Sequence, residues 1–288
     1  MPSITISHLP GRTLRRLLGS FSILYLPAPH ADARLRYGSE SLQFGDLRLP
    51  SGDGPHPVVL VIHGGFWRAK WDLSHMGHFC HALTAEGFAT WSLEYRRVGN
   101  AGGGWPGTFL DVARGADFLG SLVQAYNLDL TRVAALGHSA GGHLALWLAA
   151  RRRLDPNSPL YLSDPLPLQS VIALAAVSDL RWASRHRLGD DGLATHRLMG
   201  GPPTEYPARY DDGSPVELLP FGVPQHLLHG TADSAVPFEL SRHYYDAARS
   251  KGDPVTLTSL PSTGHFELID PASKEWTTVL RAVQTLTE

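Results

Sequence analysis

The stretch Gly137-His138-Ser139-Ala140-Gly141 decides the fold of this chain because of what flanks it. A strand-like run, residues 132–136, precedes it, and a helix-like run, residues 142–150, follows it. In that context G-x-S-x-G is typical of a nucleophile elbow, a tight strand-to-helix turn that exposes a serine hydroxyl. Chance is the alternative, since 29 of the 288 residues are glycine. The flanking runs favour the elbow, so we predict that Ser139 is a nucleophile and that the Ala140 amide donates to a substrate oxygen.

Two later loops supply the base and the acid that a serine nucleophile needs. Asp233 follows the apolar run 225–228, and His265 follows the strand-like run 255–260. A turn aspartate and a surface histidine are the alternatives for each residue taken alone. Folds with a nucleophile elbow carry the serine, the acid and the histidine in this order along the chain. We therefore predict that both residues are catalytic. Asp179, which also follows a strand-like run, is the second candidate for the acid.

The loop after another strand predicts further oxyanion donors. Val58 to His63 is a β-branched run, as expected of a parallel strand buried on both faces, and Gly64-Gly65-Phe66-Trp67 follows it. Glycines allow a sharp turn that aims amide N–H groups at a substrate oxygen, with an ordinary strand-to-loop turn as the alternative. We predict that Gly65 and Phe66 donate together with the amide that follows the serine. Trp67 is expected to be a wall of the substrate pocket, with a place in the core as the alternative.

These motifs together resemble the α/β-hydrolase superfamily, over residues 42 to 285, and within it the small serine esterases and arylformamidases. The loop His63-Gly64-Gly65-Phe66-Trp67 is similar to that of serine-type kynurenine formamidases, because Phe66 stands where lipase-like esterases usually carry a third glycine. The resemblance implies a hydrolase that cleaves short-chain or aromatic carboxylic esters through an acyl-enzyme and needs no cofactor. An arylformamidase that hydrolyses N-formyl-kynurenine is the alternative.

Strand-like and helix-like runs alternate along the chain, which predicts an α/β fold with a mostly parallel central sheet and helices on both faces. Residues 1–41 are expected to be an N-terminal extension and residues 42–288 the catalytic domain, with residues 42–49 opening the sheet. A polar segment rich in Gly and Pro, residues 180–220, is expected to be a cap that shapes the pocket; a surface excursion is the alternative. Helices are expected at residues 73–86, 107–126, 238–250 and 271–286.

Composition limits the partners. The formal net charge of −2 gives no broad basic field, so we expect a small-molecule ester or amide substrate and no nucleic acid. His75, His78 and His81 lack the spacing of a zinc-hydrolase motif, and we expect no metal. The single cysteine, Cys80, is expected to be buried. The sequence leaves the oligomeric state open.

The N-terminal residues 15–26 resemble a secretory signal only faintly, because Gly19, Ser20 and Ser22 dilute the apolar run that follows Arg15 and Arg16. A cytoplasmic protein is therefore expected, with secretion as the alternative. No run approaches the ~20 apolar residues that a membrane span requires, so no membrane partner is expected.

Overall fold

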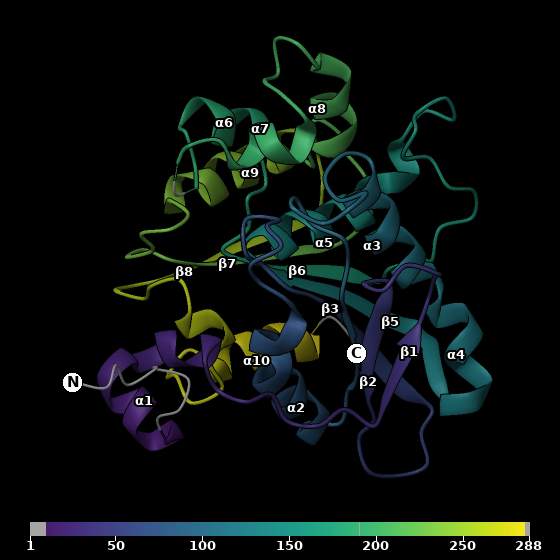
Figure 1. Ribbon diagram of the computed structural model, residues 1–288, viewed down its shortest axis with the longest axis vertical. Helices are drawn as coiled ribbons and strands as arrows, with labels where there is room; N and C mark the ends of the chain where they lie inside the picture. Colours follow the sequence, from purple (N-terminus) through teal and green to yellow (C-terminus); the bar gives the residue numbers. More distant parts are fainter. Residues whose placement is uncertain (1–9, 190, 286–288) are drawn as a thin grey trace.

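The computed structural model describes residues 10–189 and 191–285, and in this part of the chain eight strands form one sheet (Figure 1). The order across the sheet is β1-β2-β4-β3-β5-β6-β7-β8. The strands are β1 (Ala33–Arg36), β2 (Phe44–Arg48), β3 (His56–Ile62), β4 (Ala89–Leu93), β5 (Leu128–His138), β6 (Ser170–Leu174), β7 (Gln225–Gly230) and β8 (Val255–Leu260). From β4 to β8 all neighbours are parallel, whereas β1 and β2 pair antiparallel at one edge.

The sheet begins earlier in the chain than the sequence predicted. Its edge strand is β1, which pairs with β2 through Ala33 and Leu47 at one end and Arg36 and Phe44 at the other. The expected boundary at residue 42 therefore divides this hairpin. Because β1 covers only four residues and alternates between half-buried and exposed positions, its apolar signal in the sequence is weak.

Helices cover both faces of the parallel strands (Figure 1). The helices of eight or more residues after the first strands are α2 (Gly77–Ala85), α3 (Gly107–Asp117), α4 (Leu119–Tyr126), α5 (Ala140–Ala150), α9 (Phe238–Ser250) and α10 (Trp276–Thr285). In β3 the alternate residues Val58, Leu60 and Ile62 join the apolar core that contains α3, α4, α5 and α9. Val59 and Val61 join the core that contains α2 and α10. Both faces of β3 are thus dry, which explains its continuous apolar run.

Three helix predictions differ from the structure in detail. The helix expected over 107–126 is divided at Phe118 into α3 and α4. A 3₁₀ turn, η3 (Leu73–Met76), precedes α2 in the range 73–86. The closing helix α10 begins at Trp276, after a short 3₁₀ turn η5 (Glu267–Ile269), and residue 286 of the expected range lies outside the described residues.

The insertion, residues 180–220 without residue 190, forms three short helices: α6 (Leu180–Arg185), α7 (Ala194–Met199) and α8 (Pro207–Gly213). Its buried side chains, including Leu180, Leu198 and Tyr210, join the core on the α5 side of the sheet. The Trp147 indole of α5 donates to the Asp212 carbonyl at 3.0 Å. The insertion is therefore packed against α5.

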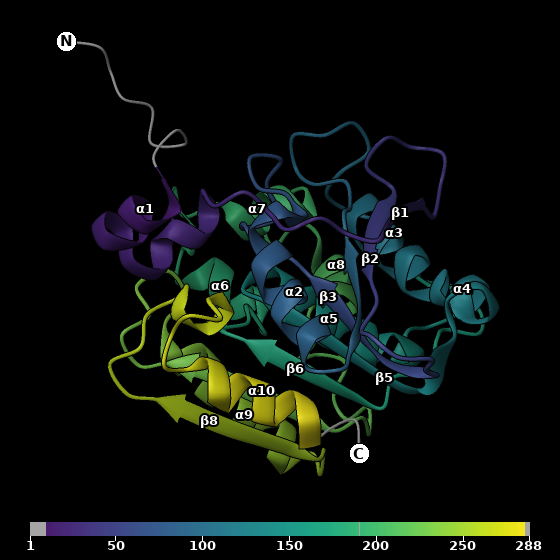
Figure 2. The ribbon, with the colours of Figure 1, turned by 90° about the horizontal axis from the view of Figure 1, so that it is seen from below.

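The N-terminal segment, which we define as residues 10–26, packs at the opposite face. It contains α1 (Gly11–Leu18) and a 3₁₀ helix, η2 (Gly19–Leu24). Ile23 is buried in the core with α2 and α10, and the Arg15 guanidinium lies 2.7 Å from the Asp270 carboxylate. Figure 2 places α1 at the end of the molecule toward which β6 and β8 point. Among the described residues, no helix has both the length and the apolar character required to cross a membrane.

Candidate active site

Ser139 occupies a strained turn between β5 and α5. Its φ of 58° and ψ of −120° lie in a region that non-glycine residues rarely adopt, which is the geometry of a nucleophile elbow. The glycines on either side make this turn possible. A Cβ on Gly137 would lie 2.0 Å from the Gly141 carbonyl oxygen, and a Cβ on Gly141 would lie 2.0 Å from the Ile62 carbonyl oxygen. The predicted elbow is therefore present.

Asp233 and His265 meet in the loops that follow β7 and β8. The two strands are parallel neighbours, so the loops that follow their carboxyl ends lie at the same edge of the sheet. His265 Nδ1–H donates to Asp233 Oδ2 at 2.6 Å, and the carboxylate is fully buried. With its proton on Nδ1, the neutral imidazole keeps a lone pair on Nε2 for a second partner.

Several further donors hold the Asp233 carboxylate as an anion. The amides of Ala235 and Val236 donate to Oδ1 at 2.8 and 2.9 Å, and His229 Nε2 lies 3.3 Å from Oδ2. Burial alone would raise the pKa of Asp233, but the hydrogen bonds from His229 and His265 hold it well below its usual range. The acid therefore stays ionised and orients the imidazole of His265.

Sequence reasoning did not assign a role to His229, the second histidine on this carboxylate. It lies at the end of β7 and is fully buried. Its Nε2–H faces the Val236 carbonyl at 2.9 Å as well as the carboxylate, and Nδ1 lies 2.7 Å from the Ser241 hydroxyl. His229 therefore supports the loop that carries the acid. Its signal in the sequence was its position four residues before the aspartate.

Ser139 and His265 line the same pocket, which has a volume of about 250 Å³. The ring of His138 lies 4.4 Å from the His265 ring, centroid to centroid, and His138 Nε2–H donates to the His265 carbonyl at 3.0 Å. Among the hydrogen bonds of the described residues, none joins the Ser139 hydroxyl to His265. Catalytic hydrogen bonds of this kind are often long without substrate and tighten when it binds.

The predicted oxyanion donors lie beside the serine. Gly65 and Phe66 line the pocket together with Ser139 and have positive φ values of 114° and 49°. A Cβ on Gly65 would lie 2.5 Å from the Trp71 Cβ, so a glycine is required there. The amides of Gly65, Phe66 and Ala140 donate to no protein group in the described part of the chain. Three N–H groups are thus free to donate to a substrate oxygen: those of Gly65 and Phe66 in the pocket lining and that of Ala140, the residue after Ser139.

A buried ion pair braces this loop, and sequence reasoning missed it. The Arg97 guanidinium lies 3.0 Å from Glu94 Oε1 and also donates to the Trp71 carbonyl, with both side chains almost fully buried. Glu94 Oε2 accepts from the Leu73 amide at 3.3 Å. The pair therefore ties the end of β4 to the loop that carries the predicted oxyanion donors. Its only sequence signal was a charged pair directly after an apolar strand.

The prediction for Trp67 requires correction, because this residue lies in the core. Its side chain is fully buried, and its indole N–H donates to His143 Nδ1 at 3.2 Å. The φ of 55° at Trp67 belongs to the backbone turn that directs the ring under the loop toward α5. Trp71 lines the pocket instead. The predicted wall was thus assigned to the wrong tryptophan of this loop.

The N-terminal segment forms another part of the pocket wall, in addition to Trp71. Phe21 and Leu24 line the pocket, and the Phe21 ring lies 4.5 Å from that of Phe266, the residue after His265. None of the described residues of the insertion lines it, contrary to the expectation that residues 180–220 shape the pocket. The complete lining is Phe21, Leu24, Gly65, Phe66, Arg68, Lys70, Trp71, His75, His138, Ser139, Ala235, His265 and Phe266.

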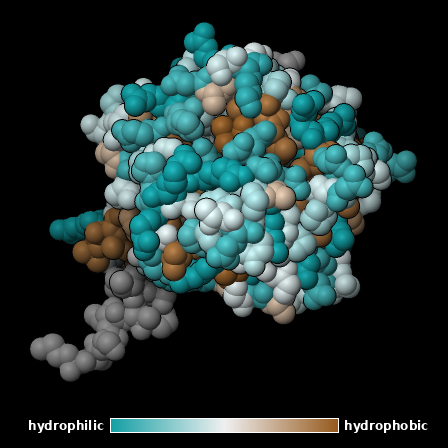
Figure 3. Space-filling view, turned by 90° about the horizontal axis from the view of Figure 1, so that it is seen from above, coloured by the Kyte–Doolittle hydropathy of each residue, from teal (hydrophilic) through white to brown (hydrophobic). Residues whose placement is uncertain are grey.

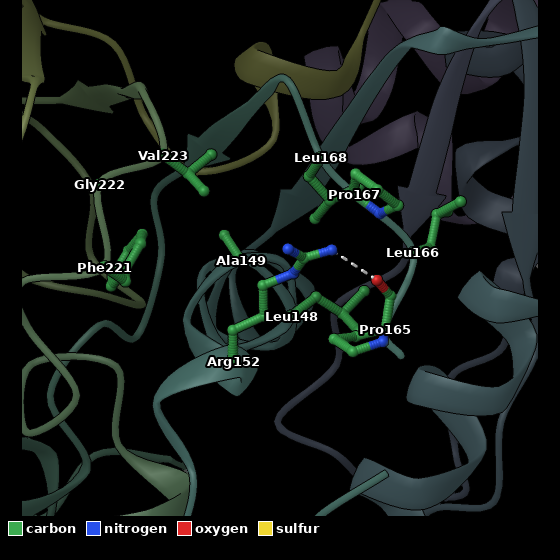
Figure 4. Close-up of a pocket in the computed structure, with 10 residues that line it drawn as sticks. All are labelled: Leu148, Ala149, Arg152, Pro165, Leu166, Pro167, Leu168, Phe221, Gly222 and Val223. Atoms are coloured by element: carbon green, nitrogen blue, oxygen red, sulfur yellow. Dashed lines mark hydrogen bonds between the residues drawn. The ribbon is translucent and has the colours of Figure 1, made fainter. Parts of the chain in front are cut away.

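The second candidate for the acid is used elsewhere. Asp179 accepts from the Trp182 amide at 2.8 Å as the N-cap of α6, and it pairs with His243 at 3.2 Å. A separate apolar pocket lies at the other end of α5, between Arg152, Pro165 and Phe221 (Figure 4). It contains none of the predicted site residues.

Comparison with known proteins finds a matching family model and relatives named as esterases. The family model described as BD-FAE matches residues 46–247. Esterase LipC from Mycobacterium tuberculosis is 28% identical over 256 residues, which are 83% of this chain and 60% of LipC. The chain thus spans less than two thirds of the length of this curated relative.

Solved structures share the fold. A truncated carbohydrate esterase from gut microbiota superposes with a TM-score of 0.77 at 21% identity, covering 91% of this chain and 97% of that one. Native esterase Est2 from the planctomycete Thermogutta terrifontis superposes with a TM-score of 0.71 at 19% identity, covering 89% and 91%. The elbow, the sheet order and the matched family model lead to one conclusion: this chain belongs to the BD-FAE family and has the α/β-hydrolase fold.

Proposed function

We propose that this chain hydrolyses carboxylic esters, with Ser139 as nucleophile, His265 as general base and Asp233 as the acid that orients it. One observation carries the proposal. A serine held at a positive φ faces the same pocket as an imidazole whose other nitrogen donates to a buried carboxylate. Each component serves a defined part of acyl transfer.

In the first step, His265 Nε2 removes the proton of the Ser139 hydroxyl as its oxygen attacks the ester carbonyl. The resulting oxyanion accepts hydrogen bonds from the free amides of Gly65, Phe66 and Ala140. Asp233, held as an anion, stabilises the imidazolium that forms. The intermediate then collapses, and His265 returns the proton to the leaving alcohol.

In the second step, the same imidazole takes a proton from water, which attacks the acyl-enzyme carbonyl. The carboxylic acid leaves and the Ser139 hydroxyl is restored. Both steps use only the ester, water and residues of this chain.

The pocket favours a small or aromatic group. Its volume of about 250 Å³ is modest, and its lining includes the apolar aromatic rings of Phe21, Phe66, Trp71 and Phe266. The relative LipC is named an esterase, which supports ester hydrolysis as the reaction class. The finer alternative, hydrolysis of an N-formyl arylamide, has no specific observation in its favour.

Covalent labelling tests the proposal. A fluorophosphonate should label the folded protein once per chain, and the Ser139→Ala variant should not be labelled. The same variant should lose p-nitrophenyl butyrate turnover by more than about 1,000-fold, because it removes the nucleophile. Full labelling of the variant, or unchanged turnover, would refute Ser139 as the nucleophile.

A substrate panel separates the ester reaction from its alternative. We expect p-nitrophenyl acetate, butyrate and an aromatic ester to be hydrolysed faster than N-formyl-kynurenine at equal concentration. Faster turnover of N-formyl-kynurenine, with loss of activity from formate to butyrate esters, would reassign the site to a formamidase.

A further inference from the structure

The N-terminal segment leaves three large apolar side chains substantially exposed. Leu17 is 66% exposed, Phe21 53% and Tyr25 39%. Tyr161, at 41%, is the one other exposed large apolar residue among the described residues. Three of these four positions thus lie within nine residues of sequence, at intervals of four. Figure 3 shows apolar surface projecting at the left edge, on the side where Figure 1 draws α1.

The charge of this segment has one sign. It carries Arg12, Arg15 and Arg16, and the first acidic residue after residue 10 is Asp32. Arg15 is occupied by Asp270 at 2.7 Å, whereas Arg12 and Arg16 are exposed. In a chain of formal net charge −2, this local positive charge complements an anionic surface.

Packing fixes which side of the segment faces outward. Leu14 and Ile23 are buried, and the Arg15–Asp270 pair fastens α1 to the loop after η5. The His78 ring nitrogen Nε2 also donates to the Pro27 carbonyl at 2.9 Å, just beyond the segment. Because these contacts occupy the inner side, Leu17 and Tyr25 remain directed to the outside.

The exposed apolar residues adjoin the mouth of the Ser139 pocket. Phe21 is both exposed and part of the pocket lining. The lining also contains Arg68 and the exposed Lys70, and it contains no aspartate or glutamate. A surface that attracts the N-terminal segment would therefore also lie next to the pocket.

We propose that the N-terminal segment docks the protein on an anionic phospholipid surface. Leu17, Phe21 and Tyr25 enter the boundary between headgroups and acyl chains, and Arg12 and Arg16 lie among the lipid phosphates. An interfacial segment of this kind needs no helix that spans the membrane, so the absence of a spanning run in the sequence does not oppose it. The docked enzyme would present its pocket to esters held in that surface.

Vesicle co-sedimentation with the full chain tests this docking. We expect binding to vesicles of phosphatidylcholine with phosphatidylglycerol, and weaker binding to phosphatidylcholine alone. The double variant Leu17→Ser/Tyr25→Ser should bind at least about tenfold more weakly, because it removes two of the apolar contacts. Tyr161→Ser, which alters an exposed tyrosine elsewhere, is the matched control and should bind like the wild type.

Charge-reversal variants measure the electrostatic contribution to vesicle binding. Arg12→Glu/Arg16→Glu should lose binding to the anionic vesicles, while Arg153→Glu, at another exposed arginine, should retain it. Added salt should weaken wild-type binding to anionic vesicles.

The docking does not depend on the proposed reaction. Ser139→Ala should bind vesicles like the wild type, and Leu17→Ser/Tyr25→Ser should hydrolyse dissolved p-nitrophenyl acetate at the wild-type rate. Absence of wild-type binding to both kinds of vesicle, or equal binding by the double variant, would overturn the proposal. So would a dimer in sedimentation velocity that the double variant abolishes, since a second copy would then be the partner of this surface.

Discussion

Two segments outside the sheet, the N-terminal segment and the insertion, contrast in what they do for the site. The insertion follows β6 directly, and its position in the chain predicts a cap over the pocket. The N-terminal segment has no such signal. In the structure Phe21 and Leu24 of the N-terminal segment line the pocket, while the described residues of the insertion pack against α5.

The difference teaches that proximity in sequence to a catalytic strand does not decide which segment borders the site. Burial decides it. The insertion places Leu180, Leu198 and Tyr210 in the core on the α5 side. The N-terminal segment places Ile23 in the core on the α2 side and leaves the Phe21 ring against Phe266. The buried apolar side chains of each segment thus determine which face of the sheet the segment covers.

The prediction with the largest expected effect tests whether the reaction takes place in the pocket beside the N-terminal segment or in the insertion. The insertion contains a serine–histidine pair of its own, since the Ser184 hydroxyl lies 2.7 Å from His196 Nε2. We expect His265→Ala to lower kcat for p-nitrophenyl butyrate by about 10⁴-fold, because it removes the general base. His196→Ala should leave kcat unchanged.

Steady-state kinetics and thermal unfolding of both variants check this. His265→Ala should unfold within a few degrees of the wild type, so that lost activity reports chemistry and not misfolding. Loss of turnover in His196→Ala, with turnover retained in His265→Ala, would move the reaction into the insertion.

The second prediction concerns the role of the insertion as a brace. His143 of α5 accepts from the Trp67 indole through Nδ1 and donates from Nε2–H to the Gly213 carbonyl at 2.8 Å. The neutral imidazole therefore links the loop that carries Trp67 to the end of α8 in the insertion. Burial lowers the pKa of His143 to about 4, below its ordinary value of 6.5.

The sign follows from proton linkage. Between pH 6.5 and about 4 the unfolded chain binds a proton at this position and the folded chain does not, so stability falls as pH falls through this window. One such group contributes a slope of at most about 1.4 kcal/mol per pH unit. His143→Gln should therefore show a shallower loss of unfolding free energy from pH 6.5 to 5 than the wild type.

Urea unfolding followed by tryptophan fluorescence at each pH measures the two slopes. His81→Gln, at an exposed position, is the matched control and should keep the wild-type slope. Equal slopes of unfolding free energy against pH for wild type and His143→Gln would show that His143 does not act as a brace. The insertion would then not support the site through this histidine.

Much of the fold could be predicted because local pattern and tertiary environment agree. The range of α9, residues 238–250, and of β8, residues 255–260, is the range expected from the sequence. The elbow could also be predicted, since the tight turn leaves no room for a Cβ at Gly137 or Gly141. The proximity of Asp233 to His265 followed from two parallel strands that end at one edge of the sheet.

What could not be predicted depends on contacts between distant parts of the chain. Trp67 and Trp71 flank the same loop, and only the partner of Trp67, the His143 ring, decides which of the two is buried. The Glu94–Arg97 brace likewise acquires its role from the Trp71 carbonyl. β1 is a short edge strand whose alternation is too brief to separate it from a loop.

The smallest expected effect measures the contrast between the two segments directly. Phe21→Ala removes a ring that lines the pocket, and Trp182→Ala removes a half-buried ring of the insertion that stacks on His186. Because an aromatic contact contributes about 0.5–1.5 kcal/mol beyond its buried area, Phe21→Ala should lower kcat/KM for an aromatic ester by about two- to twelvefold. It should affect the acetate ester less, since a small acyl group leaves the wall untouched. Trp182→Ala should leave kcat/KM unchanged for both esters. A larger loss in Trp182→Ala than in Phe21→Ala would mean that the insertion closes over the pocket during turnover, and the segment singled out by the sequence would then shape the site after all.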